Sequence, residues 1–323
     1  MEFFKYTKTY DFMGMSKKTI LASLILVLAS YVILFIDGLN YGVDFAGGTI
    51  VQVKYEKAAP IPEIRKKLSG NKLFHNASIT EFGSPQEVII RLSSSSQNVK
   101  SDIGDETSQA LQGTGKFEIR RVDMVGPKVG NELREQGLMS LVLATIGILI
   151  YVAFRFEWRF GVASIIALVH DISIAMGALA LFQVPVNLDV LAALLTLLGY
   201  SLNDTIIVFD RIREGIVKMK SVELEDVINE SVTRTLSRTT LTSLTTFFVI
   251  LTLYFFGGEI INAFAFTLLV GIVVGTYSSI FVASPVLLLF GFDIKGYRAR
   301  LAEKAKREAE KEKMRAQFEQ GTV

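Results

Sequence analysis

Six long runs of this chain carry almost no charged side chains, and no other feature constrains its fold as strongly. A helix of about 20 apolar residues spans the hydrocarbon core of a bilayer, where every backbone polar group must be paired within the protein. The sequence therefore predicts an α-helical multi-pass membrane protein with six transmembrane helices. Half of the 323 residues are hydrophobic, which agrees with this class. The runs are Thr19–Ile36, Gln136–Phe154, Phe160–Phe182, Val190–Phe209, Thr239–Gly258 and Ile260–Phe292.

The last run is longer than one span needs, so we expect a kink or an interfacial segment near Pro285 or one of its glycines. The predicted division of the chain is a cytoplasmic N-terminus (1–18), a first transmembrane helix (19–36), a periplasmic domain (37–135), helices two to six (136–292) and a cytoplasmic basic tail (293–323).

Basic residues gather on one side of the predicted spans. Lys17 and Lys18 precede the first span, and nine basic residues follow the last one between Lys295 and Arg315. The short connections on the other side, 183–189 and 257–259, contain none. Lys and Arg are enriched in cytoplasmic loops, so both termini are predicted to be cytoplasmic in the inner membrane. The alternative is that 19–36 is a signal peptide, although the run is long for one and no small-residue cleavage site follows.

The long external segment, 37–135, alternates short predicted strands and helices. Their order, βαββαβ, suggests an α+β ferredoxin-like domain inserted between the first two transmembrane helices. A plain spacer or a dimerisation module without a ligand remains the alternative, since such a fold names no function. The expected elements are strands at Ile50–Tyr55, Ser78–Phe82, Val88–Leu92 and Phe117–Val122, helices at Pro62–Leu68 and Asp102–Leu111, and a linker at Ser93–Ser96.

A Tyr-Gly-Val-Asp-Phe-Ala-Gly-Gly stretch directly follows the first span. Paired glycines such as Gly47 and Gly48 permit positive φ and a close approach of another backbone segment. With Asp44 they form a candidate structural motif at the join between membrane and external domain. The Gly-Lys-Ser/Thr ending of a phosphate-binding loop is absent.

Asp204 interrupts the fourth run, and a carboxylate near the centre of a span costs about 2.5–3.5 kcal/mol. Such residues are usually kept for ion or proton pathways. Helical spacing groups Asp204 with Asn203 on one side of its helix and predicts a second polar stripe that begins at Arg238. We predict that the stripes face each other and form a proton site, with a static polar lock as the alternative. The stripes are Thr196, Tyr200, Asn203 and Asp204, and Arg238, Thr242, Thr245 and Thr246.

The third run contains His170 and Asp171 near its middle. Adjacent residues on a helix point about 100° apart, so we expect at most one of them to face the neighbour that Asp204 faces. Asp171 is the candidate pathway residue, whereas His170 is either a relay or a hydrogen-bonded packing residue. In the last run Gly271, Gly275 and Ser279 recur every four residues, which predicts a close-packing helix face.

Six stretches of the chain resemble the SecD/SecF family of bacterial protein-export membrane proteins, which are relatives of the resistance–nodulation–division transporters. The resemblance follows nearly the whole chain in the expected order, and the fifth stretch is the most specific. The stretches are Tyr41–Thr49, Val125–Leu133, Phe154–Phe160, Val169–Ile172, Gly199–Glu214 and Arg234–Thr246.

The resemblance implies an auxiliary, non-enzymatic component of the Sec pathway that uses the proton motive force to move preproteins across the membrane and release them. It implies that the residues matching Asp204 and Arg238 serve proton passage. It also implies SecD as a partner that completes a twelve-helix assembly, together with the SecY-E-G translocon, YajC, YidC and the preprotein substrate. Protons are the expected coupling ion, with no other cofactor. Balanced charge, 34 Lys+Arg against 32 Asp+Glu, gives no case for nucleic acid, and zero cysteines exclude a thiolate metal site.

Two other classes stay open at this point. A proton-coupled exporter of small molecules or lipids would share the intramembrane Asp, but such transporters usually have twelve spans and larger external domains. An intramembrane aspartyl protease would use Asp171 and Asp204 as a dyad, which requires carboxyl groups within about 3 Å. Helix rise places Asp171 roughly 8 Å deeper than Asp204, and the Gly-x-Gly-Asp pattern of such proteases is missing.

Overall fold

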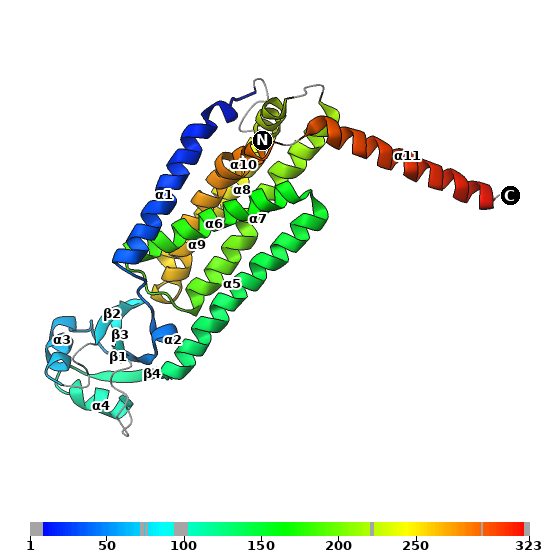
Figure 1. Ribbon diagram of the computed structural model, residues 1–323. Helices are drawn as coiled ribbons and strands as arrows, with labels where there is room; N and C mark the ends of the chain where they lie inside the picture. Colours follow the sequence, from blue (N-terminus) through cyan, green and yellow to red (C-terminus); the bar gives the residue numbers. More distant parts are fainter. Residues whose placement is uncertain are drawn as a thin grey trace.

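The computed structural model describes residues 9–71, 74, 77–93, 103–219, 223–291 and 293–319. A long helical bundle carries a small α+β domain at one end, and both chain termini lie toward the opposite end (Figure 1). Residues 1–8 of the predicted cytoplasmic N-terminus, residues 94–96 of the predicted linker and residues 320–323 of the basic tail lie outside the described residues.

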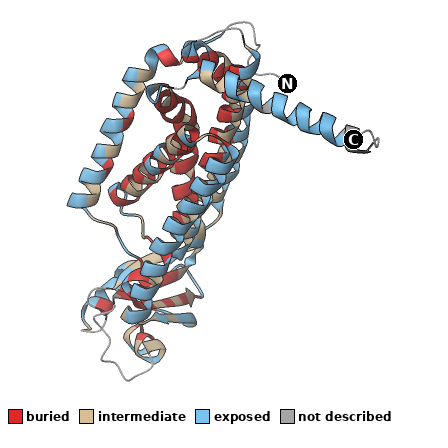
Figure 2. Ribbon diagram, turned by 45° about the vertical axis from the view of Figure 1, so that its right-hand side comes forward, coloured by how far each residue is buried: buried red, intermediate tan, exposed pale blue. Residues whose placement is uncertain are grey.

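Six helices in the described part of the chain are long and apolar enough to cross a membrane, which confirms the predicted class. Helices α6, α7 and the α9–α10 run bury 56%, 50% and 56% of their most apolar stretch, whereas α1, α5 and α8 bury only 11%. The first group therefore forms the interior of the bundle and the second its periphery (Figure 2). The helices are α1 (Ser16–Ile36), α5 (Pro127–Arg155), α6 (Trp158–Leu181), α7 (Leu188–Lys218), α8 (Leu224–Phe256), α9 (Asn262–Ser278) and α10 (Ser284–Leu289).

Three helices extend well beyond their uncharged runs. Helix α5 begins at Pro127 rather than near Gln136, α7 ends at Lys218 rather than near Phe209, and α8 begins at Leu224 rather than near Thr239. An α-helix satisfies its backbone hydrogen bonds internally, so it continues unchanged from hydrocarbon into water. The end of an uncharged run thus marks where a helix leaves the membrane, and not where the helix ends.

The long last run is interrupted where the sequence suggested. Helix α9 passes into a π-helical segment, η4 (Ser279–Ala283), and α10 follows with Pro285 in its first turn. The hydroxyl of Ser284 donates to the carbonyl oxygen of Ser279 at 3.1 Å, which pairs a carbonyl near the irregular turn. Pro285 lacks a backbone N–H, so one hydrogen bond of the regular helix is missing here. Irregular π segments of this kind commonly lie at functional sites.

The external domain is a four-stranded antiparallel sheet with two helices, in the strand order β2-β3-β1-β4. Apolar side chains of one sheet face pack with α3 and α4, and Val51, Val53, Ile64 and Ile90 at this interface are fully buried. The elements are β1 (Gly48–Tyr55), α3 (Ile61–Ser69), β2 (Ser78–Phe82), β3 (Ser84–Ser93), α4 (Ile103–Ala110) and β4 (Phe117–Val125).

The sequence did not predict four further helical segments. A four-residue helix, α2 (Val43–Ala46), lies in the stretch between α1 and the sheet. Two 3-10 turns, η1 (Met13–Met15) and η3 (Glu259–Ile261), precede α1 and α9. The basic tail forms α11 (Ile294–Glu319), which leaves the bundle sideways near the end opposite the external domain (Figure 1).

Candidate functional site

Asp171 lies at the centre of the bundle and is fully buried. Its Oδ2 accepts hydrogen bonds from Ser201 of α7 at 2.5 Å and from Ser278 of α9 at 2.8 Å. Its Oδ1 lies 2.8 Å from Nδ1 of His170, the preceding residue on α6. Hydroxyl and imidazole groups from three helices thus converge on one carboxylate, which compensates part of the cost of burying it.

Helix α9 approaches this carboxylate closely because two glycines face α7. A Cβ atom on Gly271 would lie 2.5 Å from Cδ1 of Leu197, and one on Gly275 would lie 3.2 Å from Cβ of Ser201. The close-packing face predicted for α9 is confirmed at both glycines. Ser279, the third residue of that predicted stripe, lies instead in the π segment, and its neighbour Ser278 is the one that contacts Asp171.

His170 links the Asp171 cluster to α1. Its ring stacks on Tyr277 with centroids 6.2 Å apart. The Tyr277 hydroxyl donates to the Thr19 carbonyl oxygen at 3.0 Å and accepts from Ser23 at 3.2 Å. Both His170 and Asp171 are buried, and their side chains bond to each other. Among the described residues, neither makes a hydrogen bond to Ser243 of α8, the residue that donates to Asp204.

Asp204 lies on α7, one helical turn beyond Ser201, and is 1% exposed. Its Oδ2 accepts a hydrogen bond from Ser243 of α8 at 3.2 Å. Ser243 is its one hydrogen-bond partner in the described part of the chain. The Asp204 carboxylate is therefore much less compensated than that of Asp171.

Arg238 does not pair with Asp204 as the sequence suggested. Its guanidinium attracts the carboxylate electrostatically, but no ion pair or hydrogen bond joins the two among the described residues. Arg238 is exposed, because its position on α8 turns it away from the interior toward which Ser243 points. Asn203 is also exposed although its neighbour Asp204 is buried, so the two do not share a face. Their 100° separation on the helix explains this difference.

The polar stripes predicted on α7 and α8 thus lie mostly on the outside of the six-helix bundle. Exposed polar side chains in a span do not suit a hydrocarbon environment, and they usually face protein or a water-filled cavity. This face is therefore expected to meet further protein. Its exposed members are Thr196 and Asn203 on α7, and Arg238, Thr242 and Thr245 on α8.

Asp171 and Asp204 do not form a catalytic dyad in the described structure. The hydrogen-bond donors to Asp171 are Ser201, Ser278 and His170, whereas Asp204 takes its donor from Ser243. A dyad shares one proton between carboxyl groups in direct contact. The arrangement gives the protease interpretation no support.

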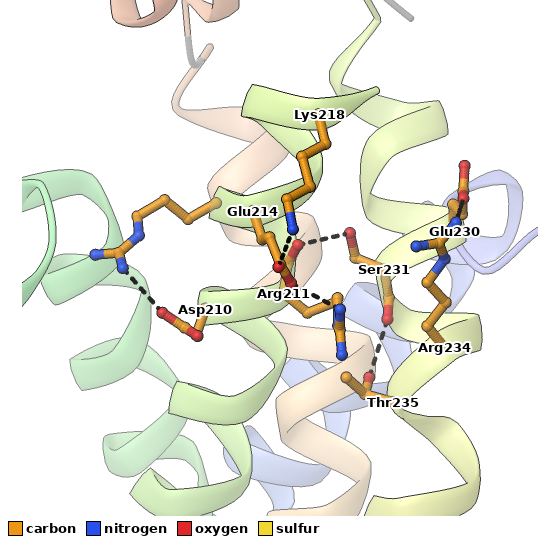
Figure 3. Close-up of polar contacts among 9 residues, drawn as sticks. Asp210, Arg211, Glu214, Lys218, Glu230, Ser231, Arg234 and Thr235 are labelled. Atoms are coloured by element: carbon orange, nitrogen blue, oxygen red, sulfur yellow. Dashed lines mark hydrogen bonds and ion pairs between the residues drawn. The ribbon is translucent and has the colours of Figure 1, made fainter. Parts of the chain in front are cut away.

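Ion pairs form within α7 and within α8 near the ends of these helices on the side of the chain termini. Glu214 accepts from Arg211 at 2.7 Å and from Lys218 at 2.6 Å, and Glu230 pairs with Arg234 (Figure 3). Exposed pairs of this kind contribute little to stability, because water screens them. Arg211 and Glu214 belong to the stretch most specific to the resemblance, yet the geometry of these pairs is that of a structural surface network.

The motif residues Asp44, Gly47 and Gly48 lie where the external domain meets the bundle. Oδ2 of Asp44 accepts the backbone N–H of Leu188, at the start of α7, at 3.0 Å. Gly47 has a φ of 74°, and a Cβ atom there would lie 2.9 Å from Cα of Pro127, so both reasons for glycine apply. Gly48 begins β1.

The sequence missed the serine donors Ser201, Ser243 and Ser278. A serine within a transmembrane helix carries little signal, because its hydroxyl can bond to its own helix backbone. Ser201 lies three residues before Asp204, which was the one available hint.

Two family models match the chain. The first, described as protein export membrane protein SecD/SecF, C-terminal, covers residues 106–293. The second, the SecD/SecF GG motif, covers residues 32–59 and includes Asp44, Gly47 and Gly48. The first match alone extends over more than half of the chain.

Proteins named protein translocase subunit SecF are similar to this chain over most or all of their length. The Helicobacter pylori protein is 47% identical over 323 residues, with both chains covered completely. The Calditerrivibrio nitroreducens protein is 46% identical over 306 residues, covering 93% of this chain and 99% of that protein. These names favour protein export over small-molecule export.

Crystal structures of SecDF resemble the fold. The structure of SecDF from Thermus thermophilus, a translocon-associated membrane protein, matches with a TM-score of 0.78 and 36% identity and covers 88% of this chain. A super-membrane-facing form of SecDF matches with a TM-score of 0.67 and 35% identity over 94% of this chain. The present chain spans only 39% and 41% of those longer chains.

Proposed function

The chain belongs to the SecD/SecF family of protein-export membrane proteins, and we propose that, as an auxiliary subunit of the Sec translocase, it uses the proton motive force to promote preprotein translocation and release across the cytoplasmic membrane. Asp204 carries the proton part of this proposal. Its carboxyl group is 1% exposed and has one hydroxyl donor within the described chain. Taking up a proton removes a poorly compensated charge from the bundle, and releasing it restores that charge.

Proton movement through this site supplies enough free energy to bias a conformational equilibrium. One charge that crosses the membrane field changes the free energy by about 2.3 kcal/mol per 100 mV. Ser201, one turn before Asp204 on α7, bonds to the central Asp171, so a shift of α7 alters contacts at both carboxylates. The two sites are therefore coupled through one rigid helix.

The exposed polar face of α7 and α8 is the proposed contact with SecD. In this arrangement the six helices form half of a twelve-helix assembly of the resistance–nodulation–division type, and Arg238 and Asn203 face the interface. We also propose contacts with SecY-E-G, YajC, YidC and the preprotein. The strand order β2-β3-β1-β4, with all neighbours antiparallel, supports a ferredoxin-like external domain.

The role of Arg238 is tested by changing its charge and its shape separately. We expect Arg238→Met to lose proton-driven export, because no cation then balances Asp204 when it is ionised. Arg238→Lys keeps the charge without the planar fork and should be partly active. The measurement is preprotein export into vesicles with and without a proton gradient, and Arg234→Met on the same helix is the matched control. Full activity of Arg238→Met would contradict the assignment.

Replacing Asp204 and Arg238 together by apolar residues distinguishes a proton site from a static polar lock. A double variant, Asp204→Leu with Arg238→Leu, replaces both polar groups by packed apolar ones, which is often neutral for stability. We expect it to assemble with SecD and to remain inactive in proton-driven export. Recovered export would favour the static lock.

Topology is tested with single cysteines, because the natural chain has none. Glu118→Cys lies on exposed β4 and Arg307→Cys on exposed α11. With both termini cytoplasmic, a membrane-impermeant maleimide should label position 118 in intact cells but position 307 only after permeabilisation. The reverse pattern would overturn the proposed orientation.

A further inference from the structure

We propose that Asp44 is a positioning residue that transmits displacement of α7 to the external domain, by capping the N-terminus of α7 from a segment 144 residues away in sequence. This inference rests on the proposed proton-driven function. It assigns to one carboxylate of the GG-motif region a mechanical role in that function.

The side chain of the N-cap residue of α7 does not cap the helix. This residue, Asn187, makes no side-chain hydrogen bond to the first turn. The Asn187 side chain is instead packed against Gly42, where a Cβ atom would lie 1.7 Å from its Oδ1. The Leu188 N–H is satisfied by Oδ2 of Asp44 at 3.0 Å. A carboxylate suits this position, because the first turn of a helix carries unpaired N–H groups and a partial positive charge.

The backbone around Asp44 is bonded to the same loop. The Gly42 N–H donates to the Val186 carbonyl oxygen at 2.9 Å, and the Val186 N–H donates to the Asn40 carbonyl oxygen at 2.8 Å. The Asn40 side chain donates to the Gln183 carbonyl oxygen at 2.8 Å. The stretch from Asn40 to Asp44 is therefore attached to the α6–α7 connection at several points.

The other side of this stretch is packed against α5. A Cβ atom on Gly130 would lie 3.0 Å from the Phe45 carbonyl oxygen and 3.2 Å from the Asp44 carbonyl oxygen. Directly after α2, Gly48 begins β1, an inner strand of the sheet. Asp44 thus connects the helix that carries Asp204 to a strand around which the external domain is built.

The Asp44 segment is attached to the start of α7 on one side and to β1 on the other, and this couples α7 to the external domain. A helix moves as a unit, so displacement at Asp204 also displaces Leu188 at the external end of α7. The Asp44 cap carries that displacement to α2 and β1. A helix cap shifts the folding equilibrium of the helix that it caps by about fivefold, so removing it should weaken the link between α7 and α2 without unfolding the bundle.

The test measures domain displacement by electron-spin distance measurements. Spin labels are placed on Glu118→Cys in β4 and on Thr252→Cys in exposed α8, in the full chain reconstituted with a cysteine-free SecD partner. Asp204→Asn represents the protonated state. We expect Asp204→Asn to change the ratio of the populations found at short and long distances between the two labels. Adding Asp44→Ala to this variant should reduce that change about fivefold. Asp44→Asn should retain most of it, because Asn caps a helix about as well as Asp.

Matched variants make each outcome decisive. Leu188→Pro removes the capped N–H at a position that tolerates proline and should act like Asp44→Ala, even if the latter fails to assemble. Asp123→Asn, a second carboxylate in the same cavity of about 280 Å³, should leave the displacement unchanged. Persistence of the displacement in both Asp44→Ala and Leu188→Pro would overturn the role of Asp44, as would its loss in Asp44→Asn. Absence of any change from Asp204→Asn alone would instead refute the proton-driven function.

Discussion

Replacement of Asp204 by Asn is expected to reduce export to the level measured when the proton gradient is collapsed, while assembly with SecD is preserved. Asn keeps the size of the side chain and an oxygen that accepts from Ser243, but it cannot gain and lose a proton. Because Asp204 is only 1% exposed, water has little access to take over the gain and loss of the proton in the variant. The measurement is preprotein export from cells and into energised vesicles that contain only the variant.

A second carboxylate on α7 provides the control. Asp210→Asn removes an acid that pairs with Arg213 at 3.0 Å on the half-exposed surface of the same helix. Because exposed pairs contribute little, export should stay near the wild-type level. Asp204→Glu retains a titratable carboxyl group and should be partly active. Normal proton-driven export by Asp204→Asn would leave Asp204 with a packing role only.

Replacement of Asp171 by Leu is expected to have the largest effect on stability. It leaves Ser201 and His170 buried without their acceptor, whereas Ser278 also donates to the Gly275 carbonyl oxygen at 3.1 Å. Each buried polar group that is left without a hydrogen-bond partner costs about 1–3 kcal/mol. The purified complex should therefore lose its monodisperse fraction at a much lower temperature than the wild type.

Asp171→Asn separates this structural role from proton passage. The amide still accepts from the serines and can donate to His170, so thermal stability should remain near the wild-type value. If Asp171 belongs to the pathway, proton-driven export should fall in this stable variant. Ser173→Ala, also buried on α6 but bonded to Tyr31 and the Val169 carbonyl oxygen instead, is the matched control. Wild-type export by Asp171→Asn would confine Asp171 to packing.

Much of the architecture could be read along the chain. The six spans, the order of strands and helices in the external domain and the irregular last span were predicted. The serine partners of Asp171 and Asp204 were not, because short hydroxyl side chains are common on helices in any environment. The long extension of α8 was also missed, since charged residues do not end a helix that leaves the membrane.

The sequence by itself determined the class of protein and its candidate carboxylates, because the cost of placing polar groups in hydrocarbon acts locally on every run of about 20 residues. Tertiary structure alone decided which polar groups meet. Contacts between spans depend on how each helix is rotated about its axis, and close packing at Gly271 and Gly275 sets the approach of α9 to α7. Burial of Asp204 then exposes Asn203, and the start of α7 receives its cap from Asp44, a residue that no sequence spacing connects to it.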